Sequence, residues 1–189
     1  SKIGKDVKAV NDFNLLLEDG EILALLGSSG CGKTTTLRMI AGFETASSGQ
    51  IKIGERVVNN LKPADRNVAM AFEGYALYPP LTVRDNIAFS LMREKISKEK
   101  VDSKVVEVAE LLEITDILER YPPSISGGQQ QRVSLARALV RDSDALLLDE
   151  PMSQLEPQIR AVLRARVKDY IQHNNKTVIF VTHDQTEAV

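Results

Sequence analysis

The sequence predicts an α/β fold built around a mainly parallel sheet. Three short and continuously apolar runs, at 22–26, 145–148 and 177–181, support this prediction. Apolar runs of this length without polar alternation are typical of strands that are buried on both faces of a parallel sheet. Helical patterns follow the first two runs, at 34–40 and from Pro157 onward. Alternation of strands and helices favours an α/β architecture.

In the first half of the chain, further elements follow from periodicity and from glycine and proline. The helix at 34–40 is expected to end at Gly42. The stretch 50–53 alternates polar and apolar residues between two glycines, which predicts a half-exposed strand. A further apolar strand is expected at 68–72, and the two prolines within 78–80 predict a loop.

In the second half, apolar residues at three- and four-residue spacing predict mainly helices. This spacing runs from 82 to about 115 and again over 129–140. Proline suits the first turn of a helix, so a third helix is expected from Pro157 to about 172. The segment 82–123 is therefore predicted to be a helical insert in the α/β fold.

The composition excludes several kinds of protein. The chain has 189 residues, of which 43% are apolar and 26% charged, as in an ordinary globular domain. A net charge of −2 argues against nucleic acid as the main partner. The single cysteine, Cys31, cannot form an internal disulfide, which fits a reducing compartment. No apolar run approaches the roughly 20 residues that span a bilayer, so a membrane role would depend on a partner.

A phosphate-binding loop is predicted at 27–34, where the sequence matches the pattern G-x-x-x-x-G-K-S/T throughout. Glycines let backbone N–H groups turn inward around phosphate oxygens, and the start of the following helix adds a positive dipole end. Lys33 can neutralise the β- and γ-phosphates, and Thr34 can ligate Mg²⁺. An exposed glycine-rich turn is the alternative, but the position between a strand and a helix favours the phosphate loop. The predicted nucleotide contacts here are Gly27, Ser28, Ser29, Gly30, Cys31, Gly32, Lys33, Thr34 and Thr35.

Two carboxylates and a histidine follow the later predicted strands. Asp149 and Glu150 end one apolar run, and His183 comes shortly after another. Ligands in open α/β sheets bind at the carboxyl ends of strands. Asp149 is predicted to hold Mg²⁺, Glu150 to act as the general base on water, and His183 to donate to the γ-phosphate. The alternatives are a solvated acidic turn and a surface histidine beside Asp184.

The segment Ser126-Gly127-Gly128-Gln129 lies between the phosphate loop and the acidic strand end. With this order of motifs, the chain resembles the ABC-type ATPases, which are the nucleotide-binding subunits of ABC transporters. The resemblance covers nearly the whole chain, and three segments look most like the subunits of carbohydrate importers. These segments are 34–38, 75–79 and 182–188.

The resemblance implies a P-loop NTPase core with a small antiparallel β subdomain and the helical insert at 82–123. Residues 1–189 would form a single nucleotide-binding domain that is incomplete at both ends. It further implies that ATP and Mg²⁺ bind and that ATP hydrolysis powers solute transport, with sugar import as the favoured case. The implied partners are a second ATPase subunit, identical or different, and transmembrane permease subunits. The implied location is cytoplasmic, on the inner face of the cell membrane.

The resemblance implies head-to-tail dimers. Each nucleotide would lie between the phosphate loop of one chain and the signature of the other, which is the segment Ser126-Gly127-Gly128-Gln129 here. The residues agree with this arrangement. Ser126 and the N–H groups of Gly127 and Gly128, with Gln129, stand at the start of a predicted helix and form a second anion site. One chain does not need two sites for the same γ-phosphate, whereas two chains that exchange them do.

Three residues depart from the family pattern. Glu73 stands where glutamine is usual. Its ionised carboxylate can bind a metal ion but cannot donate a hydrogen bond to water or phosphate. We therefore expect slower or altered hydrolysis without loss of ATP binding. Glu156 replaces aspartate after the acidic strand, and Ile3 lies about where an aromatic residue stacks on adenine.

Two alternatives stay open, and Glu73 and Glu156 favour the first of them. One is a regulatory subunit of a mixed dimer with weak hydrolysis, which intact Lys33, Asp149 and Glu150 argue against. The other is an ABC ATPase outside transport. Such proteins carry long coiled coils between the phosphate loop and the signature, whereas only about fifty residues separate Glu73 from Ser126 here.

Overall fold

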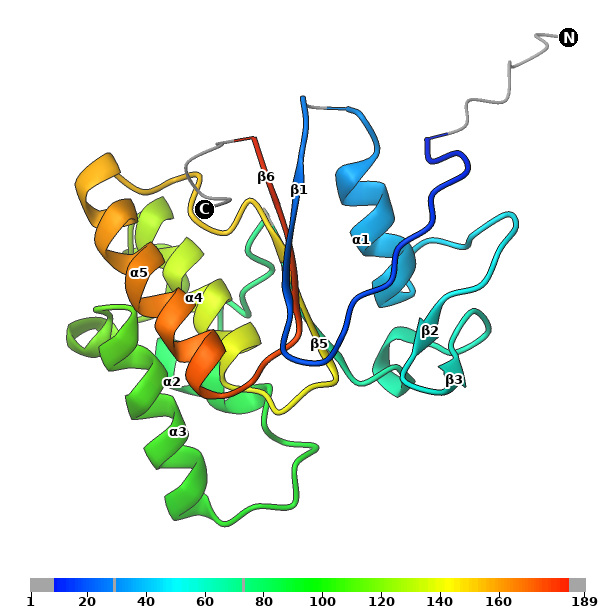
Figure 1. Cartoon of the computed structure of the whole chain (residues 1–189). Coiled ribbons are helices and arrows are strands. Elements are labelled where there is room, and N and C mark those ends of the chain that lie inside the picture. The colour runs from blue at the N-terminus through cyan, green and yellow to red at the C-terminus, as the bar shows by residue number, and fades with distance from the viewer. Residues whose placement is uncertain (1–8, 29, 73, 184–189) are drawn as a thin grey trace, which may run out of the picture.

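The computed structural model describes residues 9–28, 30–72 and 74–183, and its centre is a four-stranded parallel sheet (Figure 1). The strands lie in the order β1-β6-β5-β4, and each neighbouring pair is parallel. Their bounds are Ile22–Leu26 for β1, Val68–Ala71 for β4, Ala145–Asp149 for β5 and Val178–Thr182 for β6. The predicted α/β class is therefore confirmed. Ile3 lies outside the described residues.

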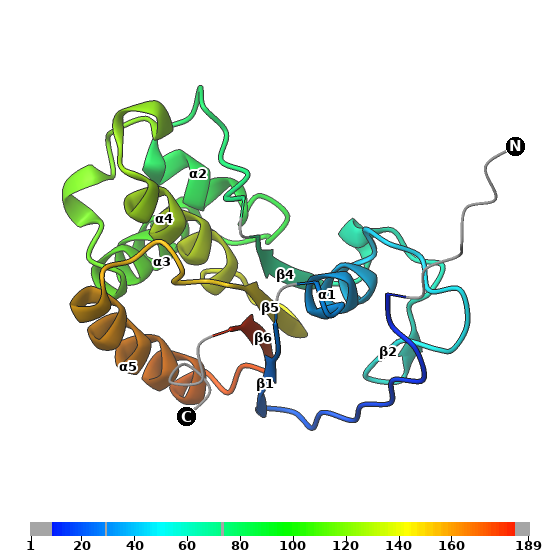
Figure 2. The same ribbon diagram turned by 90° about the horizontal axis from the view of Figure 1, so that it is seen from above.

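Helices cover both faces of this sheet. The α-helices are α1 (Lys33–Ala41), α2 (Val83–Phe89), α3 (Lys98–Leu111), α4 (Gly127–Leu139) and α5 (Pro157–His173). Three short 3₁₀ turns, η1 (Pro63–Asp65), η2 (Thr115–Ile117) and η3 (Pro122–Ser124), complete the helical elements of the described chain. Helix α1 lies on one face, beside the small antiparallel sheet, and α2 to α5 gather on the other (Figure 2).

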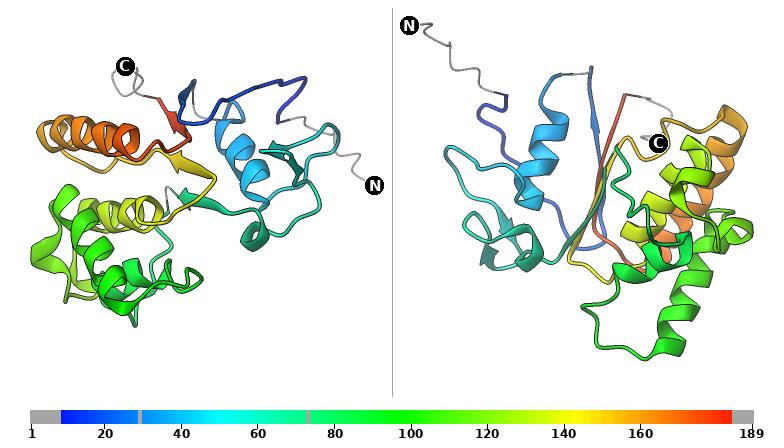
Figure 3. Two further views of the ribbon diagram at one scale, coloured as in Figure 1. Left: turned by 60° about the horizontal axis from the view of Figure 1, so that its bottom comes forward. Right: turned by 180° about the vertical axis from the view of Figure 1, so that it is seen from behind.

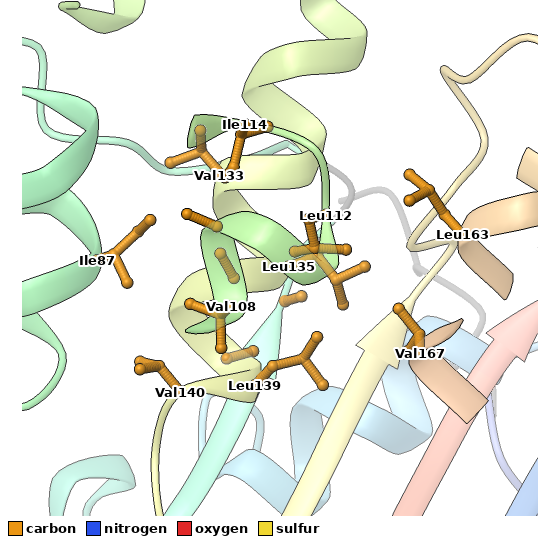
Figure 4. Close-up of a cluster of buried hydrophobic side chains, with 14 of the residues drawn as sticks. Ile87, Val108, Leu112, Ile114, Val133, Leu135, Leu139, Val140, Leu163 and Val167 are labelled. Carbon is orange, nitrogen blue, oxygen red and sulfur yellow. The ribbon is translucent and has the colours of Figure 1, made fainter. Parts of the chain in front are cut away.

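Two apolar clusters fill the space between these layers. The larger one joins α2, α3, α4 and α5 to the sheet, and its buried side chains include Leu112, Leu135 and Leu163 (Figure 4). The smaller one lies under α1 and includes Leu37, Leu147 and Ile179. Burial of one such leucine or isoleucine side chain contributes about 1.5–3 kcal/mol, so the two clusters hold α1 and the helical layer firmly against the same strands.

The strand register brings three strand ends to one edge of the sheet. Leu26 pairs with Thr182, and Asp149 pairs with Val181. Because the strands are parallel, the carboxyl ends of β1, β5 and β6 all lie at this edge (Figure 3). Segments that are more than a hundred residues apart in the sequence therefore become neighbours.

Strand β1 is less buried than its apolar sequence predicts. Its residues are half-buried, and Leu26 is 48% exposed. Within the described residues β1 pairs with β6 on one side only, so it forms an edge of the sheet. An apolar run indicates a strand but does not specify its place in the strand order.

Two other expectations need correction. The strand predicted at 50–53 shortens to β2 (Lys52–Ile53), which pairs with an unpredicted β3 (Arg56–Val57) through the two-residue turn at Gly54. The helical pattern from 82 to 115 is interrupted between Phe89 and Lys98. Ser97 explains the restart, because its side chain accepts from the Lys100 N–H at 3.3 Å and caps α3.

The structure also bears on membrane insertion. In the part of the chain that it describes, no helix combines the length and the apolarity that crossing a membrane requires.

Candidate nucleotide site

The phosphate loop connects the end of β1 to the start of α1. Helix α1 begins at Lys33, and its N-terminal flanking residue Gly32 has φ of 93°. A Cβ atom at Gly32 would also collide with the backbone oxygen of Ala9. Both the left-handed backbone and this contact require glycine at position 32. Glycine at position 32 therefore allows the loop to lead directly into the first turn of α1.

Lys33 lies over the loop that it belongs to. Its Nζ atom donates to the carbonyl oxygen of Gly27 and, at 2.8 Å, to that of Ser28. It also lies 3.5 Å from Cys31 Sγ. These contacts curl the loop around the ammonium group, which concentrates positive charge where phosphate oxygens would enter. Ser29, also predicted to contact phosphate, lies outside the described residues.

Thr34 and Asp149 meet across the site. The Thr34 hydroxyl donates to Asp149 Oδ1 at 3.2 Å, although 115 positions separate the two residues in the chain. Asp149 is 3% exposed, at the buried end of β5. A hydroxyl and a carboxylate are oxygen ligands of the kind that Mg²⁺ prefers, and Mg²⁺ takes its remaining ligands from water and phosphates. The donor set therefore fits magnesium held jointly by α1 and β5.

Glu150 and His183 form a pair that the sequence did not indicate. Nδ1 of His183 lies 3.0 Å from Oε2 of Glu150, because β5 and β6 are neighbours. The Glu150 side chain is 14% exposed and that of His183 is 64% exposed. In a neutral imidazole, an Nδ1–H that donates to the carboxylate makes Nε2 an acceptor. Donation from Nε2 to a phosphate then requires a second proton on the ring.

A cleft of about 350 Å³ joins these groups. Gly30, Lys33 and Thr35 line it from the phosphate loop and α1, and Glu150 and His183 from the strand ends. The structure thus brings a cationic loop and a carboxylate–histidine pair to the same hollow. Glu73, a predicted metal ligand, lies outside the described residues.

The signature segment forms the capped start of α4. The Ser126 hydroxyl accepts from the Gln129 N–H at 3.2 Å, and Gln129 Oε1 accepts from the Ser126 N–H at 2.9 Å. This reciprocal capping box shows that α4 begins at Gly127, two residues before the predicted start. The Gln129 side chain is engaged in this cap. Among the described residues that line the cleft, none belongs to 126–129.

The sequence reasoning missed Ser153 and Gln131. Ser153 lines the cleft, and Gln131 is buried on α4 and bonded to the turn after β5. The run of three glutamines that begins at Gln129 carried a weak signal, since a polar residue on a buried helix face needs a partner. Which of the three points inward depends on where α4 begins.

Glu156, which departs from the family pattern, occupies the N-cap of α5 without a side-chain cap hydrogen bond. We expect Glu156→Asp to raise the free energy of unfolding by about 1 kcal/mol, because aspartate is among the best N-cap residues. Urea unfolding of the two proteins measures the difference. As a control, Glu99→Asp inside the first turn of α3, which Ser97 already caps, should change stability by less than about 0.5 kcal/mol. A lower unfolding midpoint for Glu156→Asp would contradict the prediction.

A parallel sheet with a phosphate loop after β1 and carboxylates at the end of β5 defines a P-loop nucleotide-binding protein. The chain belongs to the ABC transporter family, since the model of that family matches residues 10–153. This result confirms the family that the motif order indicated.

Three relatives illustrate the similarity. The trehalose/maltose import ATP-binding protein MalK of Thermococcus litoralis is 50% identical over 194 residues, covering 100% of this chain and 52% of the relative. The sn-glycerol-3-phosphate import ATP-binding protein UgpC of Brucella abortus is 47% identical over 186 residues, covering 98% and 53%. The trehalose import ATP-binding protein SugC of Mycobacterium tuberculosis is 50% identical over 181 residues, covering 96% and 46%. The chain thus spans about half the length of these relatives.

Solved structures agree with the fold. A dimeric ATP-binding cassette in a post-hydrolysis state, bound to ADP and Pi, superposes with a TM-score of 0.89. It is 29% identical in sequence, and the match covers 100% of this chain and 86% of the other. A second dimeric structure, described as a bacterial ABC transporter cassette, gives the same values.

Proposed function

We propose that this chain is the ATP-binding and ATP-hydrolysing part of an ABC importer for sugars or related small polar solutes. The observation that carries the proposal is the meeting of the phosphate loop and the Glu150–His183 pair at one cleft, where Thr34 also binds the buried Asp149. The names of the relatives, which are import ATP-binding proteins for trehalose, maltose and sn-glycerol-3-phosphate, support the transport role.

Each group has a distinct role in the proposed reaction. The loop N–H groups and Lys33 bind the phosphates of ATP, and Thr34 with Asp149 holds Mg²⁺. When bound, Mg²⁺ neutralises charge on the β- and γ-phosphates. Glu150 accepts a proton from the attacking water, and His183 orients the Glu150 carboxylate from the side of β6.

A second ATPase subunit completes the site in this proposal. Ser126, Gly127 and Gly128 present the N-terminus of α4 but line no part of the described cleft in their own chain. They therefore serve the γ-phosphate of a nucleotide held by a second chain. The dimeric state of both solved relatives supports this arrangement. If the second chain is identical to this one, both nucleotide sites of the dimer carry Glu73.

The link to the membrane partners, in this proposal, runs through the loop after β4. Arg137 of α4 donates to the carbonyl oxygen of Ala76 at 2.7 Å, and its guanidinium lies 5.0 Å from the centroid of the Tyr78 ring. Helix α4 thus contacts the 74–80 loop directly. Movement of its signature end on nucleotide binding would shift this loop against permease subunits at the cytoplasmic face of the membrane.

The decisive test reconstitutes the full-length chain with the permease subunits that copurify with it, in proteoliposomes. We expect ATP hydrolysis, measured as phosphate release, and ATP-driven uptake of labelled trehalose, maltose or sn-glycerol-3-phosphate. Lys33→Ala should abolish both. Hydrolysis without uptake of any of the three would refute the proposed solutes, and absence of hydrolysis would refute the ATPase role.

The alternative of a weakly hydrolysing regulatory subunit rests on Glu73 and Glu156, and substitution of Glu73 tests the first of these departures. We expect Glu73→Gln to raise or otherwise alter the turnover of the assembled complex while ATP affinity stays the same, because the amide restores a donor and removes a negative charge beside the triphosphate. Phosphate release and nucleotide binding are measured side by side. An unchanged rate would count against any effect of this departure.

A further inference from the structure

Gln131 is a buried polar residue that the proposed chemistry does not use directly. It lies two residues after Gln129 on α4 and is 3% exposed. A buried amide lowers stability unless its donors and acceptor are bonded. Its partners all lie in the turn that follows β5, which is the turn that carries Glu150.

Three hydrogen bonds join Gln131 to this turn. Nε2 donates to the backbone oxygen of Glu150 at 3.0 Å and to Oγ of Ser153 at 3.1 Å. Oε1 accepts from the N–H of Gln154 at 2.8 Å. Both donors of the amide and its acceptor are thus engaged with Glu150, Ser153 and Gln154, which all lie within this one turn.

The backbone that Gln131 holds is in an unusual conformation. Glu150 has φ of 48°, in the left-handed region that residues with a side chain rarely adopt. Such a conformation costs on the order of 1–3 kcal/mol and persists only when the surroundings enforce it. The Glu150 N–H donates to Val181 at 2.9 Å on one side, and the Gln131 amide binds the Glu150 carbonyl on the other.

The start of α4 packs against the same turn. A Cβ atom at Gly128 would lie 3.2 Å from the Gln154 oxygen and 3.4 Å from a Leu155 methyl carbon, so the helix backbone approaches the turn closely there. Gly128 and Gln131 are three residues apart and therefore share a helix face. One face of α4 thus contacts the turn, while its capped end presents Ser126.

We propose that Gln131 is a positioning residue that aims the Glu150 carboxylate and joins it to the signature end of α4. Rotation or shift of α4 when the signature meets a second chain would be transmitted to Glu150 through the Gln131 amide. This inference rests on the proposed ATPase function. It predicts that loss of the amide misplaces the base without disturbing the phosphate loop, which binds ATP through other residues.

The test compares Gln131→Met with the neighbouring Gln130→Met in the full-length chain assembled with its permease subunits. Gln130 is a matched control, because its Nε2 also donates to backbone carbonyls, those of Pro122 and Ile125, but does not contact the Glu150 turn. We expect Gln131→Met to lower kcat by roughly tenfold to a hundredfold, as for a misplaced catalytic group, with KM for ATP within about twofold of wild type. Gln130→Met should keep kcat within about twofold.

A second variant guards against misfolding. Gln131→Glu keeps the size of the side chain and the acceptor for Gln154 but loses the donors to Glu150, so it should also lower kcat and spare KM. Wild-type kcat in either Gln131 variant, an equal loss in Gln130→Met, or a loss confined to KM would overturn the positioning role while the ATPase function stands. A wild-type complex that hydrolyses no ATP would instead overturn the proposed function and this inference with it.

Discussion

Replacement of Glu150 by glutamine is expected to lower ATP turnover by a factor of roughly 10²–10⁴, which corresponds to about 3–5.5 kcal/mol of activation barrier. A glutamine has nearly the same shape and can still pair with the His183 ring, so the geometry of the strand ends should persist. It cannot accept a proton from water. ATP should therefore still bind, because the phosphate loop and Lys33 are untouched.

Two measurements separate these effects. Phosphate release by the assembled complex gives kcat, and titration with a fluorescent ATP analogue gives the affinity. Asp144→Asn is the matched control, since it makes the same chemical change beside the opposite end of β5, in an exposed ion pair with Arg56 at 3.2 Å. It should leave turnover unchanged. Full activity of Glu150→Gln would rule out Glu150 as the base and point to water activation by phosphate itself.

The second large effect concerns stability and comes from Arg66, a 3% exposed residue at the end of η1. Its guanidinium donates to the carbonyl oxygens of Met39 and Ile40 at 2.8 and 3.0 Å, at the C-terminus of α1. It also donates to the carbonyls of Leu61 at 2.9 Å and Asn59 at 3.2 Å. Burial lowers the pKa of this guanidinium, but an arginine in a protein stays charged. Its charge therefore complements the negative end of the α1 dipole.

Arg66→Met should lower the free energy of unfolding by about 3 kcal/mol, because several carbonyl groups lose a charged donor at once. For a chain of this length the melting temperature should fall by about 2–4 °C per kcal/mol, that is, by roughly 6–12 °C. Urea and thermal unfolding of the full-length chain provide both values. The stability of Arg66→Lys should lie between those of the wild type and Arg66→Met, since one ammonium group cannot reach all of these carbonyl oxygens.

Arg56→Met is the control for this prediction. The Arg56 side chain is 49% exposed and pairs with Asp144 at the surface, so its loss should change stability by less than about 1 kcal/mol. Equal losses for the two methionine variants would contradict the prediction that the buried carbonyl contacts of Arg66 set the size of the effect.

Much of the fold could be predicted because its signals are local. A short apolar run predicts a strand wherever it occurs, and β1, β5 and β6 appear close to the predicted positions. Helix α1 ends at Gly42, whose φ is 90°, as a terminal glycine should. The interruption between Phe89 and Lys98 was missed because apolar spacing continues across it, and the Ser97 cap was the one contrary signal.

The candidate site likewise has features that the local sequence predicts and others that depend on the fold. Phosphate binding by the loop at 27–34 could be predicted from its sequence and stays a prediction, since the chemistry of phosphate binding resides in consecutive backbone N–H groups and one lysine. The pairing of Glu150 with His183 could not, because it depends on β6 lying beside β5. Gln129 is a comparable case: its motif suggested a ligand contact, and the structure shows its side chain closing the cap of α4.

The sequence by itself therefore determined the α/β class, the phosphate loop, the strand-end carboxylates and the family, because each depends on the order of residues along a short segment. Only the tertiary structure decided which strand ends meet, that β1 lies at a sheet edge within the described residues, and that Gln131 rather than Gln130 binds the Glu150 turn. These depend on strand order and on the exact start of α4. The strand order results from the packing of two apolar clusters against a common sheet, which no single segment encodes. The Ser126–Gln129 cap sets the start of α4 locally, but only the packing of α4 shows which of its faces meets the Glu150 turn.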